Sequence, residues 1–207
     1  MRFTIRIFLL LAVTVGYAQR EYQSYSNDNG IHTIRVSDGV YKIRFFSNEA
    51  VETEFIATGS VSENSLAVVD KSVFQSVKAQ ELRDKVDLSS GLIRVVVTYK
   101  PFSIAYYKSG QLIATELAAS RTNKETSVKL SVNADESLLG GGSRVLGMNR
   151  RGNKLRLYNK AHYGYETRSE LMNYCIPMYL SSELYGVHFD NTWVGDLDLD
   201  SGKQNVV

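Results

Sequence analysis

The chain has 207 residues, and its 24 lysines and arginines against 22 acidic residues give a formal net charge of +2. A charge this close to neutral gives no reason to expect nucleic-acid binding, because proteins that bind nucleic acids carry a clustered basic surface. The single cysteine, Cys175, excludes an intrachain disulfide, and its thiol is expected to be buried among apolar groups.

The N-terminus has the pattern of a secretory signal peptide. Arg2 and Arg6 give a positive region before an apolar run from Ile7 to Val15, and the small residues Gly16 and Ala18 fit a cleavage site after position 18. A membrane-spanning helix needs roughly 20 apolar residues, about twice this run. We therefore expect residues 1–18 to be removed and residues 19–207 to form one exported domain, periplasmic or extracellular, with no membrane span.

Most of the remaining chain alternates apolar with polar residues at a period of two, which indicates β-strands. In chain order the alternating segments are 41–45, 93–99, 154–158, 185–190 and 196–200, and the segments 104–107 and 112–113 flank a hairpin turn at 108–110. Turn-forming sequences lie between them, at 27–30, 37–39, 89–91, 108–110 and 151–153. This order of short strands and turns predicts an all-β, antiparallel β-sandwich or closed barrel with few or no helices.

Three other segments carry weaker signals. Residues 79–88 have the one short helical pattern, and the polar stretches 60–72 and 119–127 are expected to be long loops. The last residues, 205–207, follow a turn and resemble a strand that is just beginning, which suggests that the chain is cut before a following domain.

Two motifs resemble ligand-binding sites, but a structural role explains each of them better. Asp196, Asp198 and Asp200 resemble the start of a calcium loop, but Ser201 and Val207 stand where that loop needs glycine and glutamate. The intervening leucines favour a strand instead. The glycine run 140–142 is not followed by a helical pattern, so it predicts a tight bend with close backbone contact rather than a phosphate cradle. The sequence thus predicts no metal site and no cofactor.

A loop dense in aromatic and hydrogen-bonding groups follows the strand at 154–158. Its candidate functional residues are Asn159, Lys160, His162, Tyr163 and Tyr165. Tyrosine offers both an apolar ring face and a polar hydroxyl, so such a loop suits contact with a sugar, although a packed aromatic corner remains the competing interpretation. No segment resembles the end of a buried parallel strand that presents an acid into a cleft, so no catalytic carboxylate pair is expected.

Four ordered motifs between residues 138 and 191 resemble one family. The run LLGGGSRVLGMNRRGNKLRLYN at 138–159 is similar to the pattern YGxGER…NRRG…LxxxN, and residues 163–165 to its YGY turn. The segment NYCIPMYLSS at 173–182 resembles YxxIPFyiSS, and YGVHFDN at 185–191 resembles GYGxFFDN. Together they resemble the N-terminal domain of family 31 glycoside hydrolases, most closely its α-glucosidases and 4-α-glucosyltransferases.

The resemblance implies a β-sandwich of the galactose-mutarotase-like type that packs on a C-terminal (β/α)8 barrel. In the family, that barrel carries the catalytic aspartates, so this chain alone is expected to be inactive and to hold no catalytic residue. One loop of the N-terminal domain reaches over the barrel's active site toward the α-glucan or oligosaccharide substrate. By position, that loop is 159–165 in this chain.

Two residues depart from the family pattern. Ser143 stands where the family usually has glutamate, and Ala161 stands where it often has a sugar-contacting aspartate. Loss of that carboxylate removes a charge-assisted hydrogen bond, so the contact shifts to His162 or Lys160, the specificity changes, or activity is lost.

Three competing interpretations remain open. They are a free-standing carbohydrate-binding module, a purely structural secreted domain, and a mutarotase-like epimerase. The epimerase would need a glutamate base and histidine acids. His32 is a candidate for such an acid, because it shares one strand face with Ile34 and Val36 and is expected to point inward.

Overall fold

The computed structural model describes residues 20–62, 64–69, 72–121, 125–169, 172–190 and 193–207. The proposed signal peptide lies outside the described residues. No helix forms in the described ranges, and about half of the chain is in antiparallel strands, so the predicted all-β class is confirmed. None of these residues forms a helix of the length and apolarity that crossing a bilayer requires.

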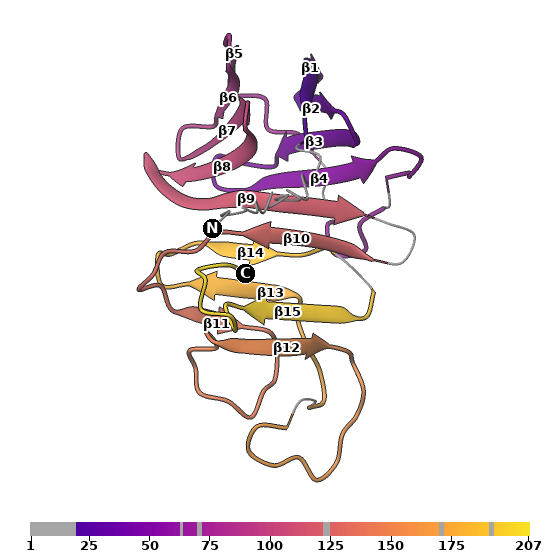
Figure 1. Ribbon diagram of the computed structural model, residues 1–207, viewed down its shortest axis with the longest axis vertical. Coiled ribbons are helices and arrows are strands. Elements are labelled where there is room, and N and C mark those ends of the chain that lie inside the picture. The colour runs from indigo at the N-terminus through magenta and orange to yellow at the C-terminus, as the bar shows by residue number, and fades with distance from the viewer. Residues whose placement is uncertain (1–19, 63, 70–71, 122–124, 170–171, 191–192) are drawn as a thin grey trace, which may run out of the picture.

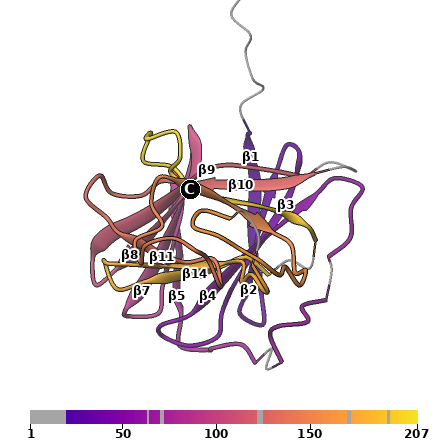
Figure 2. The same cartoon turned by 90° about the horizontal axis from the view of Figure 1, so that it is seen from below.

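Two sheets form the upper part of the molecule in Figure 1. The first sheet has the order β1-β2-β3-β4, and its strands are Tyr22–Asp28, Ile31–Val36, Gly39–Phe45 and Val51–Ala57. The second has the order β10-β9-β8-β7-β6-β5. Its strands, from β5 to β10, are Lys78–Glu81, Lys85–Ser89, Ile93–Tyr99, Phe102–Lys108, Gln111–Arg121 and Thr126–Leu130. Seen from below in Figure 2, β7 and β8 lie to one side of β2 and β4.

The core between these sheets comes from the alternation that the sequence displays. Tyr41, Ile43 and Phe45 are fully buried, because successive side chains of β3 point to opposite faces. They pack with Val86, Leu88, Val95, Val97 and Ile104 of the second sheet and with Ile34 and Val36 of the first. This face-to-face burial confirms the predicted sandwich.

The lower part of Figure 1 holds two smaller sheets. One has the order β11-β13-β14, with strands Leu138–Gly140, Met178–Ser181 and Gly186–His188, and the other pairs β12, Asn153–Leu157, with β15, Gly195–Leu199. Their apolar faces enclose a second core of Val132, Leu138, Leu155, Tyr179, Leu197, Leu199 and Val207. The aspartate-rich segment is therefore a strand, as its leucines predict.

The ends of β10 and of the chain connect the two parts. Leu130 and Val207 exchange backbone hydrogen bonds of 2.8 and 2.9 Å, and Ser131 forms an isolated antiparallel bridge with Val206. Residues 205–207, which were expected to begin a strand, form only this isolated bridge and belong to none of the described strands.

Two sequence predictions are wrong. Residues 79–88 form the hairpin β5–β6 and not a helix, because Val86 and Leu88 face the core with a period of two and pair with β7. The expected loop at 119–127 is largely strand, since β9 extends to Arg121 and β10 begins at Thr126. The stretch 60–72 contains no strand among its described residues, as expected.

The predicted hairpin turn at 108–110 is confirmed. Ser109 and Gly110 join β8 to β9 with φ angles of 50° and 83°. Two consecutive residues with positive φ are typical of the type I′ turn, whose twist matches that of the two strands.

Candidate functional site

The glycine run 140–142 lies where two backbone segments touch. All three glycines have positive φ, of 119°, 75° and 84°. A Cβ on Gly140 would lie 2.5 Å from the carbonyl oxygen of Met178, and one on Gly142 would lie 2.6 Å from the Cα of Cys175. A side chain at Gly140 or Gly142 would clash with main-chain atoms, and one at Gly141 would clash with the Leu155 side chain, so the predicted close backbone approach is confirmed.

The candidate loop connects β12 to β13 and extends to the lowest point of Figure 1. Two backbone hydrogen bonds join this connection to the residues after the glycine run, from the Ser143 amide to the Tyr174 carbonyl at 3.1 Å and from the Arg168 amide to the Val145 carbonyl at 3.1 Å. The Asn159 side chain adds a third bond, because its Oδ1 accepts from the Cys175 amide at 2.6 Å. The loop therefore has a fixed base and an extended tip.

The other four candidate residues project from that tip. Lys160, His162, Tyr163 and Tyr165 are all exposed, Tyr163 by 91% and Tyr165 by 47%. None of them forms a hydrogen bond or ion pair with another residue in the described part of the chain. The structure thus places these residues on one surface loop with their polar atoms available to a ligand. It does not pack them as an aromatic corner.

The two departures from the family pattern occupy different environments. The Ser143 hydroxyl donates to the sulfur of Met172 at 3.6 Å, so its side chain is used inside the loop base. Ala161 is exposed at the tip beside Lys160 and His162. Only the second departure changes the surface that a ligand would meet.

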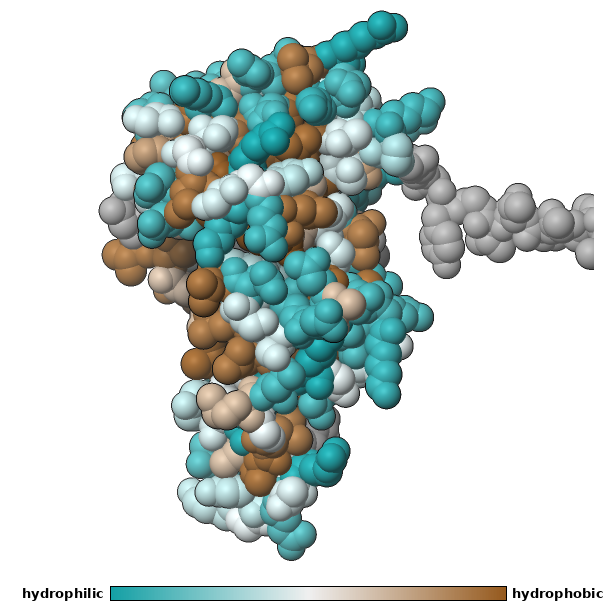
Figure 3. Space-filling view, turned by 90° about the vertical axis from the view of Figure 1, so that its left-hand side faces the viewer, coloured by the Kyte–Doolittle hydropathy of each residue, from teal (hydrophilic) through white to brown (hydrophobic). Residues whose placement is uncertain are grey.

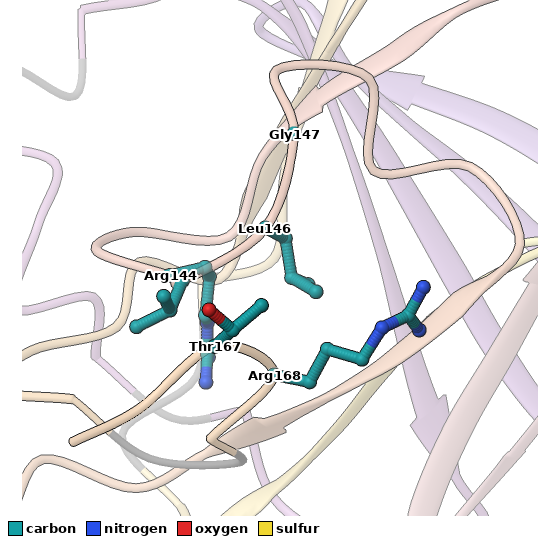
Figure 4. Close-up of a pocket in the computed structure, with 6 residues that line it drawn as sticks. Arg144, Leu146, Gly147, Thr167 and Arg168 are labelled. Atoms are coloured by element: carbon teal, nitrogen blue, oxygen red, sulfur yellow. The ribbon is translucent and has the colours of Figure 1, made fainter.

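A shallow depression lies beside the loop, and no sequence signal indicated it. It is lined by Arg144, Val145, Leu146, Gly147, Thr167 and Arg168, has a volume of about 460 Å³, and is shown in Figure 4. The Arg144 guanidinium donates to the carbonyls of Gly141 at 3.0 Å and Arg156 at 2.6 Å. Arg168 extends away from Arg144 and Thr167 in the same view. Arg144 therefore holds the backbone around the glycine run.

Buried ionisable groups lie inside the sandwich, where they are hydrogen-bonded to neighbours. Tyr41 donates its hydroxyl hydrogen to Glu116, and Arg20 donates to Tyr41 and, at 2.7 Å, to Asp38. Burial raises the pKa of Glu116, although the Tyr41 hydrogen bond and the Arg20 charge act in the opposite direction. These contacts join β3 and β9 and position no group toward the loop.

His32 points into the core, as expected from the strand face it shares with Ile34 and Val36, and is 1% exposed. Its Nδ1 shares a 2.9 Å hydrogen bond with the Tyr25 hydroxyl, and its Nε2 has no partner among the described residues. It packs edge-on against Phe45. His188, by contrast, is exposed on β14. Among the described residues, no three histidine, cysteine or acidic side chains come together in a way suited to a metal ion.

Comparison with known proteins identifies one family over most of the chain. Residues 33–198 match the glycosyl hydrolase 31 N-terminal galactose mutarotase-like domain. The chain is 23% identical over 188 residues to alpha-glucosidase 2 of Bacillus thermoamyloliquefaciens, a match that covers 86% of this chain and 24% of the relative.

Solved structures show the same fold. A GH31 dextranase of Flavobacterium johnsoniae in complex with glucose superposes with a TM-score of 0.83 at 21% identity, over 91% of this chain and 24% of the dextranase. The cycloalternan-forming enzyme of Listeria monocytogenes, in complex with a pentasaccharide, has a TM-score of 0.75 at 15% identity, over 90% of this chain and 19% of the enzyme. The chain thus spans a quarter or less of the length of these relatives.

Proposed function

The chain belongs to the glycosyl hydrolase 31 N-terminal galactose mutarotase-like domains, and on that premise we propose that it is the accessory, carbohydrate-contacting domain of a longer exported enzyme. That enzyme acts on α-glucosides, by hydrolysis or by transglucosylation. The relatives named above include an alpha-glucosidase and a dextranase, which supports an α-glucan or oligosaccharide as the substrate. The catalytic aspartates belong to a (β/α)8 barrel that follows this domain.

The observation that carries the proposal is the exposed tip of the loop after β12. Tyr163 and Tyr165 expose rings that can stack on a sugar, and Lys160 and His162 provide nitrogen donors beside them. The hydrogen-bonded base limits the positions that the tip can reach, which lowers the entropy cost of binding. The loop of this domain lines one side of a sugar subsite, and the barrel provides the catalytic residues.

Exposed apolar side chains support the proposal that another domain packs against this one. In the C-terminal third they include Ile176, Leu180, Leu184, Trp193 and Val194, and Figure 3 shows apolar groups at the surface of one face of the molecule. Exposed apolar area of this kind favours burial against another surface. We assign that surface to the barrel of the same polypeptide.

The first test uses the reading frame beyond codon 207. Translation of the complete frame should give a protein that releases p-nitrophenol from p-nitrophenyl α-glucoside, whereas the 207-residue chain alone should release none. A stop codon at 208 with no barrel encoded nearby would overturn the proposal, and so would turnover by the chain alone.

The second test removes the tip aromatic in the complete enzyme. Tyr163→Ala should lower kcat/KM for maltooligosaccharides by about 5- to 150-fold, which corresponds to about 1–3 kcal/mol for truncation of a contacting aromatic side chain. Tyr163→Phe keeps the ring and should retain most of the activity. Equal activity in all three proteins would show that the tip does not touch the substrate.

A free-standing carbohydrate-binding module is the second candidate, because the exposed tip offers its aromatic rings without help from another domain. Isothermal titration of the purified chain with maltooligosaccharides distinguishes the two. Millimolar or tighter binding that Tyr163→Ala abolishes would favour the module. No heat at millimolar sugar favours a contact that exists only beside the barrel.

A further inference from the structure

One side-chain hydrogen bond joins the two ends of the candidate loop. Asn159 lies two residues after the end of β12, and Cys175 lies three residues before the start of β13. The Cys175 amide donates to Asn159 Oδ1 at 2.6 Å, across a separation of sixteen residues. The bond therefore closes the loop at its base, below the tip that carries Lys160 to Tyr165.

The backbone on the Cys175 side of this bond has no room to move toward the sheet. A Cβ on Gly142 would lie 2.6 Å from the Cα of Cys175 and 2.8 Å from the amide nitrogen of Ile176. The neighbouring Ser143 amide donates to the Tyr174 carbonyl at 3.1 Å. Residues 174–176 thus lie directly against the glycine run, and Asn159 is hydrogen-bonded to a segment whose position this contact restricts.

We propose that Asn159 is a positioning residue, which acts through the Cys175 amide to hold the loop tip in place and does not itself contact the sugar. This inference rests on the proposed function of the loop, and it assigns to Asn159 a role different from that of Lys160, His162, Tyr163 and Tyr165. The role needs only the side-chain oxygen as an acceptor. Aspartate can therefore replace asparagine, whereas alanine cannot.

Cys175 provides a direct readout, because it is the one cysteine in the sequence and its side chain is half-buried. The rate of alkylation by iodoacetamide at pH 8 reports opening of the loop base. Asn159→Ala should raise this rate about fivefold, which corresponds to about 1 kcal/mol at 1.4 kcal/mol per factor of ten. Asn159→Asp should stay within twofold of the unmodified chain.

Asn173→Ala is the matched control. Asn173 lies on the same loop near Cys175, but its side chain is exposed and forms no hydrogen bond with the described residues. Its replacement should leave the alkylation rate unchanged. An Asn159→Ala rate within twofold of the unmodified chain would overturn the proposal, as would an Asn159→Asp rate as fast as that of Asn159→Ala.

Amide hydrogen exchange at Cys175 gives a second measurement that needs no thiol chemistry. Protection of this amide should fall about fivefold in Asn159→Ala and persist in Asn159→Asp. Gly142→Ala should displace residues 174–176 and raise both rates although Asn159 is intact. If Gly142→Ala does not fold, the two Asn159 variants still decide the question.

These readouts require no sugar, so they separate the two proposals. If Tyr163→Ala has no effect on the complete enzyme, the sugar-contacting function fails while the alkylation and exchange results stand. If the tip variants lower kcat/KM but Asn159→Ala leaves Cys175 protected, the function stands and the positioning role of Asn159 fails.

Discussion

Arg151 donates from Nε to Asp200 Oδ2 at 3.0 Å, and the two side chains are only 14% and 5% exposed. Asp200 also accepts hydrogen bonds at Oδ1 from the amides of Gln204 and Val206. Arg151 in turn reaches the carbonyls of Asn133 and Glu136 and the side chain of Asn205. This pair therefore connects the turn before β12 with the last residues of the chain.

Asp200→Ala should lower the free energy of unfolding by about 3 kcal/mol. The variant leaves a nearly buried guanidinium without its carboxylate, which typically costs 3–5 kcal/mol, and frees two backbone amides. Urea unfolding followed by circular dichroism measures the change. Asp196→Ala is the control, because Asp196 is 37% exposed in its pairs with Lys154 and Arg156 and should contribute about 1 kcal/mol or less.

His32 should make the domain less stable as the pH falls from 7 to 5. Burial lowers the pKa of His32 below its usual value of 6.5. The unfolded chain then takes up the proton first, so the stability from the neutral ring is present above pH 6.5 and is lost as the pH falls toward the folded-state pKa.

His32→Gln should reduce that loss, because glutamine does not titrate and can still accept from Tyr25. Urea midpoints at several pH values measure the slope. His188→Gln, at an exposed position, serves as the control and should leave the slope unchanged. A steeper slope in His32→Gln than in the unmodified chain would contradict the prediction.

Glu116 should have the opposite pH dependence. Burial raises its pKa above the unfolded value, so its contribution is present below pH 4.5 and is lost as the pH rises through the folded-state pKa. Glu116→Gln keeps an oxygen to accept from Tyr41 and removes the buried charge. The variant should be at least as stable as the unmodified chain at pH 8, and its advantage should shrink toward pH 4. Thermal unfolding at both pH values checks this. A stability advantage of Glu116→Gln that grows at low pH would contradict the prediction that burial disfavours the charged form of Glu116.

Leu184→Gly should stabilise the domain by about 0.5–1 kcal/mol. Leu184 adopts a φ of 60° in the turn between β13 and β14, a conformation that costs a residue with a Cβ about 1–2 kcal/mol, whereas glycine adds about 0.5–1 kcal/mol of unfolded-state entropy. Its side chain is 79% exposed, so little burial is lost. Leu180→Gly, within β13, should instead destabilise. Chemical denaturation midpoints of the two variants show whether each change stabilises or destabilises the domain.

Much of the fold follows from consecutive residues. The alternation at 41–45 and 93–99 indicated which side chains face the core, and Tyr41, Ile43, Val95 and Val97 are buried accordingly. The hairpin turn at 108–110 followed from turn chemistry. The helical pattern at 79–88 gave a wrong prediction because Leu82 to Asp84 form the turn between two short strands. Pairing of β6 with β5 and β7 makes this segment part of a sheet.

The candidate loop was located by its composition and order, but its internal roles were not. Asn159 and His162 are both polar residues of one short segment, and no local pattern distinguishes them. The hydrogen bond to Cys175, sixteen residues away, distinguishes the role of Asn159 from that of His162. The sugar-contacting roles of Lys160, His162, Tyr163 and Tyr165 stay predictions.

The sequence by itself determined the strand faces and the main turns, because these depend on side-chain period and on φ angles that are set within a few residues. It also indicated a tight bend at 140–142, but the tertiary structure decided which backbone segments, at Met178 and Cys175, these glycines touch. Only the tertiary structure decided that Arg151 neutralises Asp200, that Glu116 meets Tyr41, and that Asn159 bonds to Cys175. Such pairs form between groups far apart along the chain, and what joins them is the stacking of sheets around a shared core, which no local stretch of residues encodes.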